Sequence, residues 1–333
     1  MLDHDFKRVM MDLFLSKLLQ HARQNKDQRL EFLESLIPFM NDSIPPLFID
    51  FIHRLKENEN KKLNSLIDQL LAIADDQTIK TIILNMIING YMTGKDMILN
   101  HEKKFGFLLP LMITYHFNRE EPFYLYKRNV KTLIHESESI GIFIHQLMLH
   151  HPRFSIHQAI ELAREFPKSV FLLYVDPKVI DLGLNEYLKG VHHVVILIQM
   201  DDYPLFNEAL TKIRPSRKII GGFARVNHER LENYLTDSHL LRLTKDNVPL
   251  QVLLPQKHHV LNHQLIDRIN HRSEQPVITV DGRHFIHETS RRIIGKPRAF
   301  TIYSSGRTES YLGKGGSVYN RSLLKVLRET MPK

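Results

Sequence analysis

The sequence predicts an α/β fold, a partial (β/α) barrel that follows an all-helical N-terminal domain. Two near-continuous apolar runs, 140–149 and 170–175, flank a segment with helical spacing of apolar residues, 156–166. Such runs around an amphipathic helix are typical of a β-α-β unit with a buried parallel sheet. Further apolar runs at 191–199 and 219–226 continue the alternation, which predicts a barrel-like sheet that does not close.

The first 104 residues predict helices throughout. Leucines recur near helical spacing over 13–19 and again, with Phe32 and Ile37, over 30–37. Pro45-Pro46 is expected to begin a further helix, because proline is tolerated in a first helical turn. The runs 63–71 and 79–91 predict a fourth and a fifth helix. No residue pattern in this part indicates chemistry, so we interpret it as a helical cap.

The order of the predicted elements divides the chain into three parts. These are a helical domain over 1–104, a partial (β/α) barrel over 105–272 and a small region over 273–333. The remaining expected elements are a first barrel strand 107–115, helices 129–139, 205–213 and 231–243, and a strand 250–254. For the last region, the resemblance to a known family that is described below implies short strands 277–280 and 300–306, a turn 292–295 and a last helix 322–330. Gly221-Gly222 predicts a close approach of another chain segment to the strand over 219–226.

Polar residues stand where the predicted strands end. His150 and His151 follow the first run, Asp176 follows the second and Asp201 the third. Ligands of parallel α/β sheets bind at the carboxyl ends of the strands, so these four side chains are the candidate binding residues. The sequence leaves open whether bulky side chains fill the cleft that they would line.

The same frame carries a resemblance to a known family. The strand 142–148 ends in Leu149-His150-His151-Pro152, and the next ends in Val175-Asp176-Pro177-Lys178. In order and spacing the chain resembles the radical S-adenosylmethionine enzymes, specifically the subgroup with an auxiliary-cluster, SPASM-like C-terminal region. The resemblance implies that these two strand ends correspond to the turns that hold the cofactor in that family.

The residues that carry the family's chemistry are missing. The resemblance places the three cluster cysteines on His116, Glu120 and Phe123, and two auxiliary cysteines on Arg292 and Tyr311. The sequence contains no cysteine, so these residues cannot supply the thiolates of a four-iron cluster. We therefore expect no iron–sulfur cofactor and no metal. Binding of S-adenosylmethionine is an open alternative that we do not favour.

Other groupings of histidines and acids have weaker spacing signals. A single metal ion held by His116, Glu120 and His150 is an alternative, since all three side chains can be ligands. The pairs His259/His263 and His284/His287 have helical spacing but no acidic third ligand at motif spacing. We interpret both pairs as ordinary surface histidines. Asp176 and Asp201 could meet across strand ends as an acid/base pair.

Charge and glycine patterns add little. The net charge is +8, but the basic residues are scattered apart from clusters at 214–218 and 291–298, so nucleic-acid binding is not expected. The glycine-rich stretch 313–317 lacks phosphate-loop spacing and predicts a flexible loop. The N-terminus lacks an apolar signal-peptide core, and the longest apolar runs fall short of the roughly 20 residues of a membrane span. We expect a cytoplasmic protein without a membrane span.

These observations together predict a radical-enzyme-like pseudoenzyme that acts by binding, as a scaffold or a regulator. The expected partner is a protein or peptide, including an active relative, or a small molecule in the former cofactor cleft. One alternative is an enzyme with non-radical chemistry that uses His116, His150, His151 and Asp176. Another is a regulator that associates with nucleic acid through the net positive charge of the chain.

Overall fold

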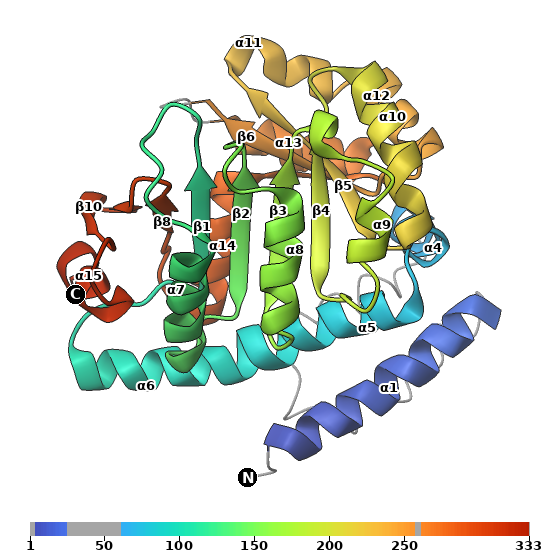
Figure 1. Cartoon of the computed structure of the whole chain (residues 1–333). Coiled ribbons are helices and arrows are strands. Elements are labelled where there is room, and N and C mark those ends of the chain that lie inside the picture. Colours follow the sequence, from blue (N-terminus) through green and yellow to red (C-terminus); the bar gives the residue numbers. More distant parts are fainter. Residues whose placement is uncertain (1–3, 25–60, 257–260, 333) are drawn as a thin grey trace.

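The computed structural model describes residues 4–24, 61–256 and 261–332. They form a ten-stranded sheet with helices around it (Figure 1). The strands are β1 Met112–Phe117, β2 Ile144–Leu149, β3 Val170–Val175, β4 Val194–Gln199, β5 Ile219–Val226, β6 Leu250–Pro255, β7 Ile278–Asp281, β8 Phe300–Tyr303, β9 Arg307–Ser310 and β10 Gly313–Ser317. The helices are α1 His4–Gln24, α4 Lys61–Ile73, α5 Asp76–Leu84, the π-helix η1 Asn85–Gly94, α6 Lys95–Phe105, α7 Lys127–Ser139, α8 Ile156–Glu165, η2 Pro177–Val179, α9 Leu184–Tyr187, α10 Tyr203–Ile213, η3 Arg214–Ser216, α11 His228–Leu231, η4 Glu232–Tyr234, α12 Asp237–Lys245, α13 His263–Arg272, α14 Gly282–Ile294 and α15 Leu323–Thr330.

The strand order confirms the predicted fold class. The sheet reads β10-β9-β8-β1-β2-β3-β4-β5-β6-β7, and the pairs from β8 to β7 are all parallel. This is the sequential order of an eight-stranded (β/α) barrel in which β7 and β8 do not pair. The chain passes between them through α14, which lies behind β1 and β2 in Figure 1. The barrel is therefore partial, and β9 and β10 extend its β8 edge as antiparallel strands.

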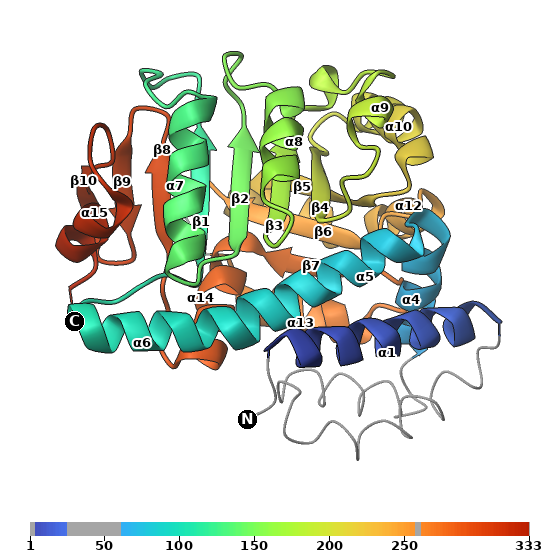
Figure 2. The ribbon, with the colours of Figure 1, turned by 60° about the horizontal axis from the view of Figure 1, so that its bottom comes forward.

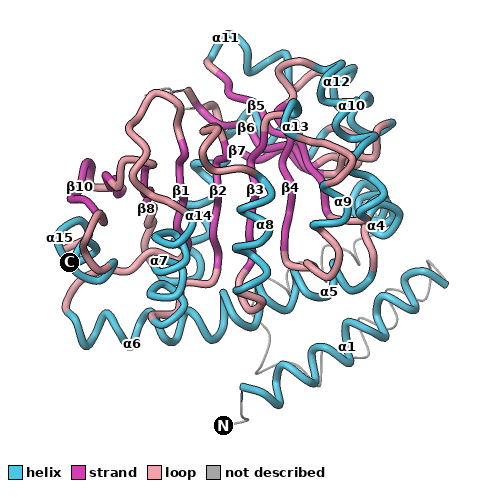
Figure 3. The backbone as a smooth tube through the Cα atoms, in the orientation of Figure 1, coloured by secondary structure: helices cyan, strands magenta, loops and turns pink. Residues whose placement is uncertain are grey.

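The helices that follow the strands cover the outer face of the sheet (Figure 3). Helix α8 begins with a capping box, in which Ser155 accepts from the Gln158 N–H and the Gln158 side chain accepts from the Ser155 N–H. Its buried side includes Ala159, Ile160 and Ala163, which belong to the same apolar core as the outward residues of the strands. Burial of both faces explains why the strands read as continuous apolar runs.

A long helical rod, formed by α5, η1 and α6, lies along the amino-terminal edge of the strands (Figure 2). Within η1, Asn85 and Asn89 are buried and donate to backbone carbonyls just before β3, those of Pro167, Lys168 and Ser169. At its end, a Cβ on Gly94 would lie 2.4 Å from the Gly141 carbonyl oxygen. The rod thus contacts the sheet through its backbone and through side-chain amides, and side chains larger than glycine do not fit at Gly94.

A buried ion pair anchors the strand on the β8 side of the opening. Arg298 precedes β8, has 2% of its side chain exposed and pairs with Glu102 of α6. The guanidinium also donates to the Leu109 carbonyl over 2.7 Å, and the Leu109 N–H donates to Glu102 over 2.7 Å. These bonds connect the α14–β8 link to the α6–β1 link, with no orphaned carboxylate oxygen in the group.

Several predicted elements were placed wrongly. The first strand is Met112–Phe117 instead of 107–115, and the predicted helix 231–243 is divided into α11, η4 and α12. The predicted turn 292–295 is the end of α14, where Gly295 has φ 79° and caps the helix. The predicted loop 313–317 is strand β10, paired with β9. Propensity alone did not reveal that β9 offers β10 a partner.

The remaining predicted strands are present, but 140–149 and 191–199 begin before β2 and β4, and 300–306 extends past the end of β8. The close approach at Gly221-Gly222 is confirmed. Cβ atoms there would lie 2.8 Å from Leu197 Cδ2 and 2.1 Å from Met200 Sδ. The predicted helices over 25–60 lie outside the described residues. The domain boundaries at 104 and 272 stay predictions, although β8 to β10 continue the barrel sheet. Within the described residues, no helix has the length and apolar character that a membrane span requires.

Candidate functional site at the carboxyl ends of the strands

Four side chains from four strands meet at the carboxyl ends of the sheet. The His116 ring lies 6.3 Å from that of His150 and 5.5 Å from that of Tyr303, measured between centroids. Arg225 approaches from β5, with Nη2 3.5 Å from His116 Nε2. Since β2, β3 and β4 separate β1 from β5, this contact requires the sheet to curl. We call these residues, His116, His150, Arg225 and Tyr303, the rim cluster.

An apolar layer fills the interior directly below the rim cluster. The rings of Tyr174 and Phe223 are 5.3 Å apart, and Phe223 lies 6.0 Å from His150. Met148 packs against the same group. Leu149 and Met200, in contrast, belong to the core on the outer side of the sheet. The side chains that fill the interior below the rim are therefore Met148, Tyr174 and Phe223. A ligand at the rim cluster would lie above this layer.

The two rim histidines are neutral at physiological pH. Burial, with the nearby charge of Arg225, lowers the pKa of His116 to about 4, although Glu121 opposes the shift. Burial, again with Arg225, lowers the pKa of His150 to about 3. The His150 Nε2 atom is buried and has no hydrogen-bond partner among the described residues. A neutral imidazole can donate or accept there, so the described residues leave one hydrogen-bonding atom of His150 unused.

Arg225 differs from the other arginines near the rim. Arg230 pairs with Asp201 over 2.8 Å, and Arg307 pairs with Glu121 over 2.8 Å while its guanidinium lies 3.7 Å from the Tyr303 ring centroid. Arg225 is half-buried, and no carboxylate of the described residues lies within ion-pair distance of it. Burial lowers its pKa, but an arginine keeps its charge at neutral pH. Asp201 and Glu120 act on Arg225 from beyond ion-pair distance, so its guanidinium has acids nearby but no direct carboxylate partner among the described residues.

Asp201, a predicted binding residue, is already engaged by protein groups. Its carboxylate accepts from Arg230, from the Tyr234 hydroxyl over 3.0 Å and from the Gln199 amide over 2.7 Å. Burial raises the pKa of Tyr234 to about 12, and the negative charge of Asp201 adds to that shift. This acid belongs to the rim but has its hydrogen bonds satisfied within it.

His151 and Asp176, the other two predicted residues, support local structure. The His151 ring stacks on Phe123 at 4.6 Å, and its Nδ1 accepts from the Arg153 N–H over 3.1 Å. Asp176 caps the 3₁₀ turn η2 by accepting from the Lys178 N–H over 2.9 Å. Neither has a contact with the rim cluster, and Asp176 and Asp201 each bond elsewhere. Of the four predicted binding residues, the structure places only His150 in the rim cluster.

The three positions on which the resemblance places the cluster cysteines do not converge. His116 lies in the rim cluster, Glu120 is exposed, and Phe123 is buried against Phe117 and Tyr126. The described residues contain no group of three or more histidines and acids arranged to hold a metal ion, so the alternative site of His116, Glu120 and His150 is not assembled. The structure thus offers these three positions no common ligand.

The two positions on which the resemblance places the auxiliary cysteines are equally separate. Arg292 is exposed at the end of α14 and bonds Glu288 over 2.7 Å, whereas Tyr311 follows β9 and its N–H donates to Ala299. Among the histidine pairs, His259 lies outside the described residues. His263 stacks on His284 at 3.8 Å, which places these two rings together across α13 and α14.

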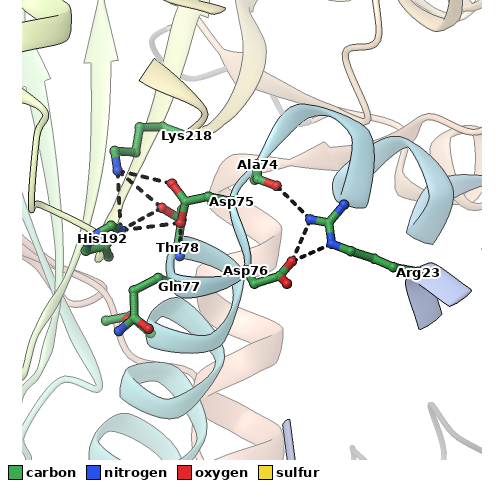
Figure 4. Close-up of polar contacts among 9 residues, drawn as sticks. Arg23, Ala74, Asp75, Asp76, Gln77, Thr78, His192 and Lys218 are labelled. Atoms are coloured by element: carbon green, nitrogen blue, oxygen red, sulfur yellow. Dashed lines mark hydrogen bonds and ion pairs between the residues drawn. The ribbon is translucent and has the colours of Figure 1, made fainter. Parts of the chain in front are cut away.

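A second polar network lies at the opposite, amino-terminal end of β5 (Figure 4). Lys218 has 3% of its side chain exposed, and its Nζ lies 3.6 Å from Asp75, 3.3 Å from the Thr78 hydroxyl and 3.4 Å from His192 Nδ1. Asp75 also caps α5 by accepting from the Thr78 N–H over 2.6 Å. Burial lowers the pKa of Lys218 while Asp75 opposes that shift. This buried cation, unlike Arg225, has an acid beside it.

Sequence reasoning missed Arg225, although a signal was present. In the strand 219–226, Gly221, Phe223 and Arg225 occupy alternate positions on one face, so a charged residue continues an otherwise apolar inner face. Alternation within β5 would have placed the arginine inside the barrel, near the carboxyl end. The position of His116 opposite to it depends on sheet curvature, which the sequence does not show.

Comparison with known proteins identifies no family. No protein-family model and no curated protein matches the chain. Among solved structures, native anSMEcpe with bound AdoMet and Cp18Cys peptide, which is of the radical SAM, SPASM type, aligns over 66% of this chain and 80% of its own at 10% identity and a TM-score of 0.44. The tryptophan synthase A-subunit of Pyrococcus furiosus aligns over 59% and 87% at 13% identity and a TM-score of 0.36. Type I 3-dehydroquinate dehydratase of Clostridium difficile aligns over 58% and 74% at 10% and 0.32. Such scores establish neither common ancestry nor common activity, and the fold class rests on the strand order itself.

Proposed function

We propose that this chain is a binding protein that takes the carboxylate or phosphate group of a small molecule at the rim cluster. The observation that carries the proposal is the half-buried guanidinium of Arg225, which has no carboxylate partner among the described residues. A guanidinium matches the planar geometry of oxyanions and binds them through charge-assisted hydrogen bonds. His116 and His150 stand beside it as neutral hydrogen-bonding groups.

The proposal favours binding over catalysis for two reasons. Without cysteine, these 333 residues provide no thiolate for an iron–sulfur cluster, so radical chemistry of that kind is not available to them. The rim histidines have pKa values of about 4 and about 3, which makes them weak bases at neutral pH. On this proposal the chain is a pseudoenzyme with the architecture of a radical enzyme. A protein or peptide partner, the absence of nucleic-acid binding and a cytoplasmic location stay predictions.

Calorimetric titration tests the proposal with three oxyanion probes, which are inorganic phosphate, malonate and S-adenosylmethionine. We expect saturable binding of at least one probe, weakened at least tenfold in Arg225→Met because the cation is lost. The matched control is Arg153→Met, which removes an exposed arginine from the loop after β2. Absence of Arg225-dependent binding for all three probes contradicts the proposal. Stoichiometric iron in the purified protein would contradict its non-radical part.

A further inference from the structure

A cavity lies far from the rim cluster, around the amino-terminal end of β5. It has a volume of about 320 Å³, at the lower end of the range of small-molecule sites. Its lining comes from the end of α4, from α10 and η3, from β5 and from the turn before β6, and comprises Ala72, Ile73, Leu210, Arg214, Arg217, Ile220 and Asn247. We call it the α4–β5 pocket. Its walls combine four aliphatic side chains with two guanidinium groups and one amide.

The two arginines of the pocket are not neutralised by the nearby acids. Arg214 donates to the backbone carbonyl of Asp246, whose carboxylate is bonded by the Tyr203 hydroxyl. Asp75 follows the pocket residues Ala72 and Ile73 in the chain, and its carboxylate pairs with Lys218 (Figure 4). No side-chain bond of Arg217 to another described residue is present. The pocket therefore has a positive surplus over an apolar wall.

The backbone at the pocket is strained at two of its seven residues. Arg217 has φ 54° and Asn247 has φ 48°, and the only other non-glycine residue with positive φ in the described part of the chain is Asn320. Left-handed backbone costs a residue with a Cβ free energy that glycine avoids, and such strain clusters at functional sites. At position 217 a glycine would suit the backbone better, yet the chain places an arginine there, beside the cavity.

We propose that the α4–β5 pocket binds a short amphipathic oxyanion, a carboxylate or phosphate with an aliphatic body. The guanidinium groups of Arg214 and Arg217 would hold the head group, and the aliphatic lining would take the body. A nucleic-acid backbone fits less well, because Lys218, the third basic residue of the cluster 214–218, is buried and paired and so does not face a partner. This site is independent of the rim cluster and of the function proposed for it.

Titration of the full chain with hexanoate and hexyl phosphate tests this site. Saturable binding of at least one probe is expected, with acetate, inorganic phosphate and hexanol at least tenfold weaker at this site, because each lacks either the body or the charge. Arg217→Gly should weaken the probe at least tenfold while the melting temperature stays equal or rises, since glycine relieves the left-handed backbone. If the role of Arg217 were purely structural, the probe affinity and the melting temperature would fall together.

Two further variants make the result decisive. Ala72→Leu keeps a good helix former in α4 and fills the cavity, so it should weaken the probe without unfolding the protein. Arg268→Ala removes an exposed arginine of α13 outside the pocket and should leave the affinity unchanged. The proposal is overturned if neither probe binds, if hexanol binds equally well, if Arg217→Gly and Ala72→Leu both retain full affinity, or if Arg225→Met removes the binding while Arg217→Gly does not.

Discussion

The two ends of strand β5 each present a basic residue, and the two residues have opposite environments. Lys218, just before the strand, has an acid, a hydroxyl and an imidazole within 3.6 Å of its ammonium group. Arg225, next to the last residue of the strand, has only the imidazole of His116 within 3.5 Å of its guanidinium among the described residues. Both cations are withdrawn from solvent, but only Lys218 has a carboxylate within ion-pair distance, whereas Asp201 and Glu120 act on Arg225 from farther away.

The difference separates stability from binding. In (β/α) barrels active sites lie at the carboxyl-terminal face, whereas contacts at the amino-terminal face serve stability, and the proposed α4–β5 pocket is an exception to that pattern. The Lys218 network follows that rule, since it joins the start of α5 to the segments that precede β4 and β5. At the other end, Arg225 lies beside two neutral histidines without a direct acid partner, and on the proposed function a bound anion would supply that partner.

The largest expected effect comes from acid, to which the two histidines at the carboxyl end contribute beside the fully buried His145 of β2, whose pKa burial lowers to about 3. His116 and His150 have folded pKa values of about 4 and about 3, below the unfolded value of 6.5. Their stabilising contribution is therefore complete above pH 6.5 and is lost as the pH falls toward the folded values. Between pH 6.5 and about pH 4.5 we expect the free energy of unfolding to fall by roughly 2 to 3 kcal/mol for each histidine.

Urea unfolding across this pH range measures the loss. The double variant His116→Gln/His150→Gln should show a clearly flatter pH profile than the parent. Arg268→Ala is the control, because it removes an exposed charge of α13 that keeps its proton throughout this range. A double variant as acid-sensitive as the parent would show that the rim histidines do not resist protonation.

The second effect is expected at the amino-terminal end. Asp75→Ala leaves Lys218 buried without its acid and removes the cap of α5, so the free energy of unfolding should fall by about 3 kcal/mol. The partial exposure of Asp75 keeps the figure at the low end for a broken buried pair. Adding Lys218→Met should recover part of the loss. Asp76→Ala, which removes a more exposed partner of Arg23, should cost no more than about 1 kcal/mol; equal losses for the two aspartates would erase the contrast.

The smallest effect on stability should come from Arg225. Because this cation has no acid to lose, Arg225→Met should change the free energy of unfolding by less than about 0.5 kcal/mol, or raise it. Thermal unfolding without added anions measures this change. A fall of the melting temperature as large as that of Asp75→Ala would mean that Arg225 is a structural cation after all.

Much of the fold could be predicted from the sequence, because parallel strands that are buried on both faces consist of consecutive apolar residues. Strands β3 and β5 have the predicted bounds, 170–175 and 219–226. Strand β1 was placed too early, since apolarity begins at Phe107 whereas parallel pairing with β2 begins at Met112. Pro110 lies in that lead-in and has no N–H to donate to a ladder. Strand β10 was missed because lysine and glycines carry no strand preference without β9 beside them.

The candidate site was less predictable than the fold. The rule that ligands bind at carboxyl ends placed His150 correctly near the rim cluster. It could not show that His151 would turn onto Phe123, or that Asp176 would be used to cap the next turn. Arg225 was hidden inside a strand, and its meeting with His116 depends on how far the sheet curls between β1 and β5. Curvature is a property of the assembled sheet and not of a residue pattern.

The missing pairing between β7 and β8 has a geometric consequence for the whole ring. In a closed barrel the number of strands and the shear together fix the radius. This ring is cut at one seam, so its width depends on α14 and on the anchor that Arg298 provides before β8. Lengthening the segment 295–299 would change that width without altering the register of a single strand pair. No hydrogen bonds between β7 and β8 close the ring, so α14 and the Arg298–Glu102 ion pair bridge the seam between its two edge strands.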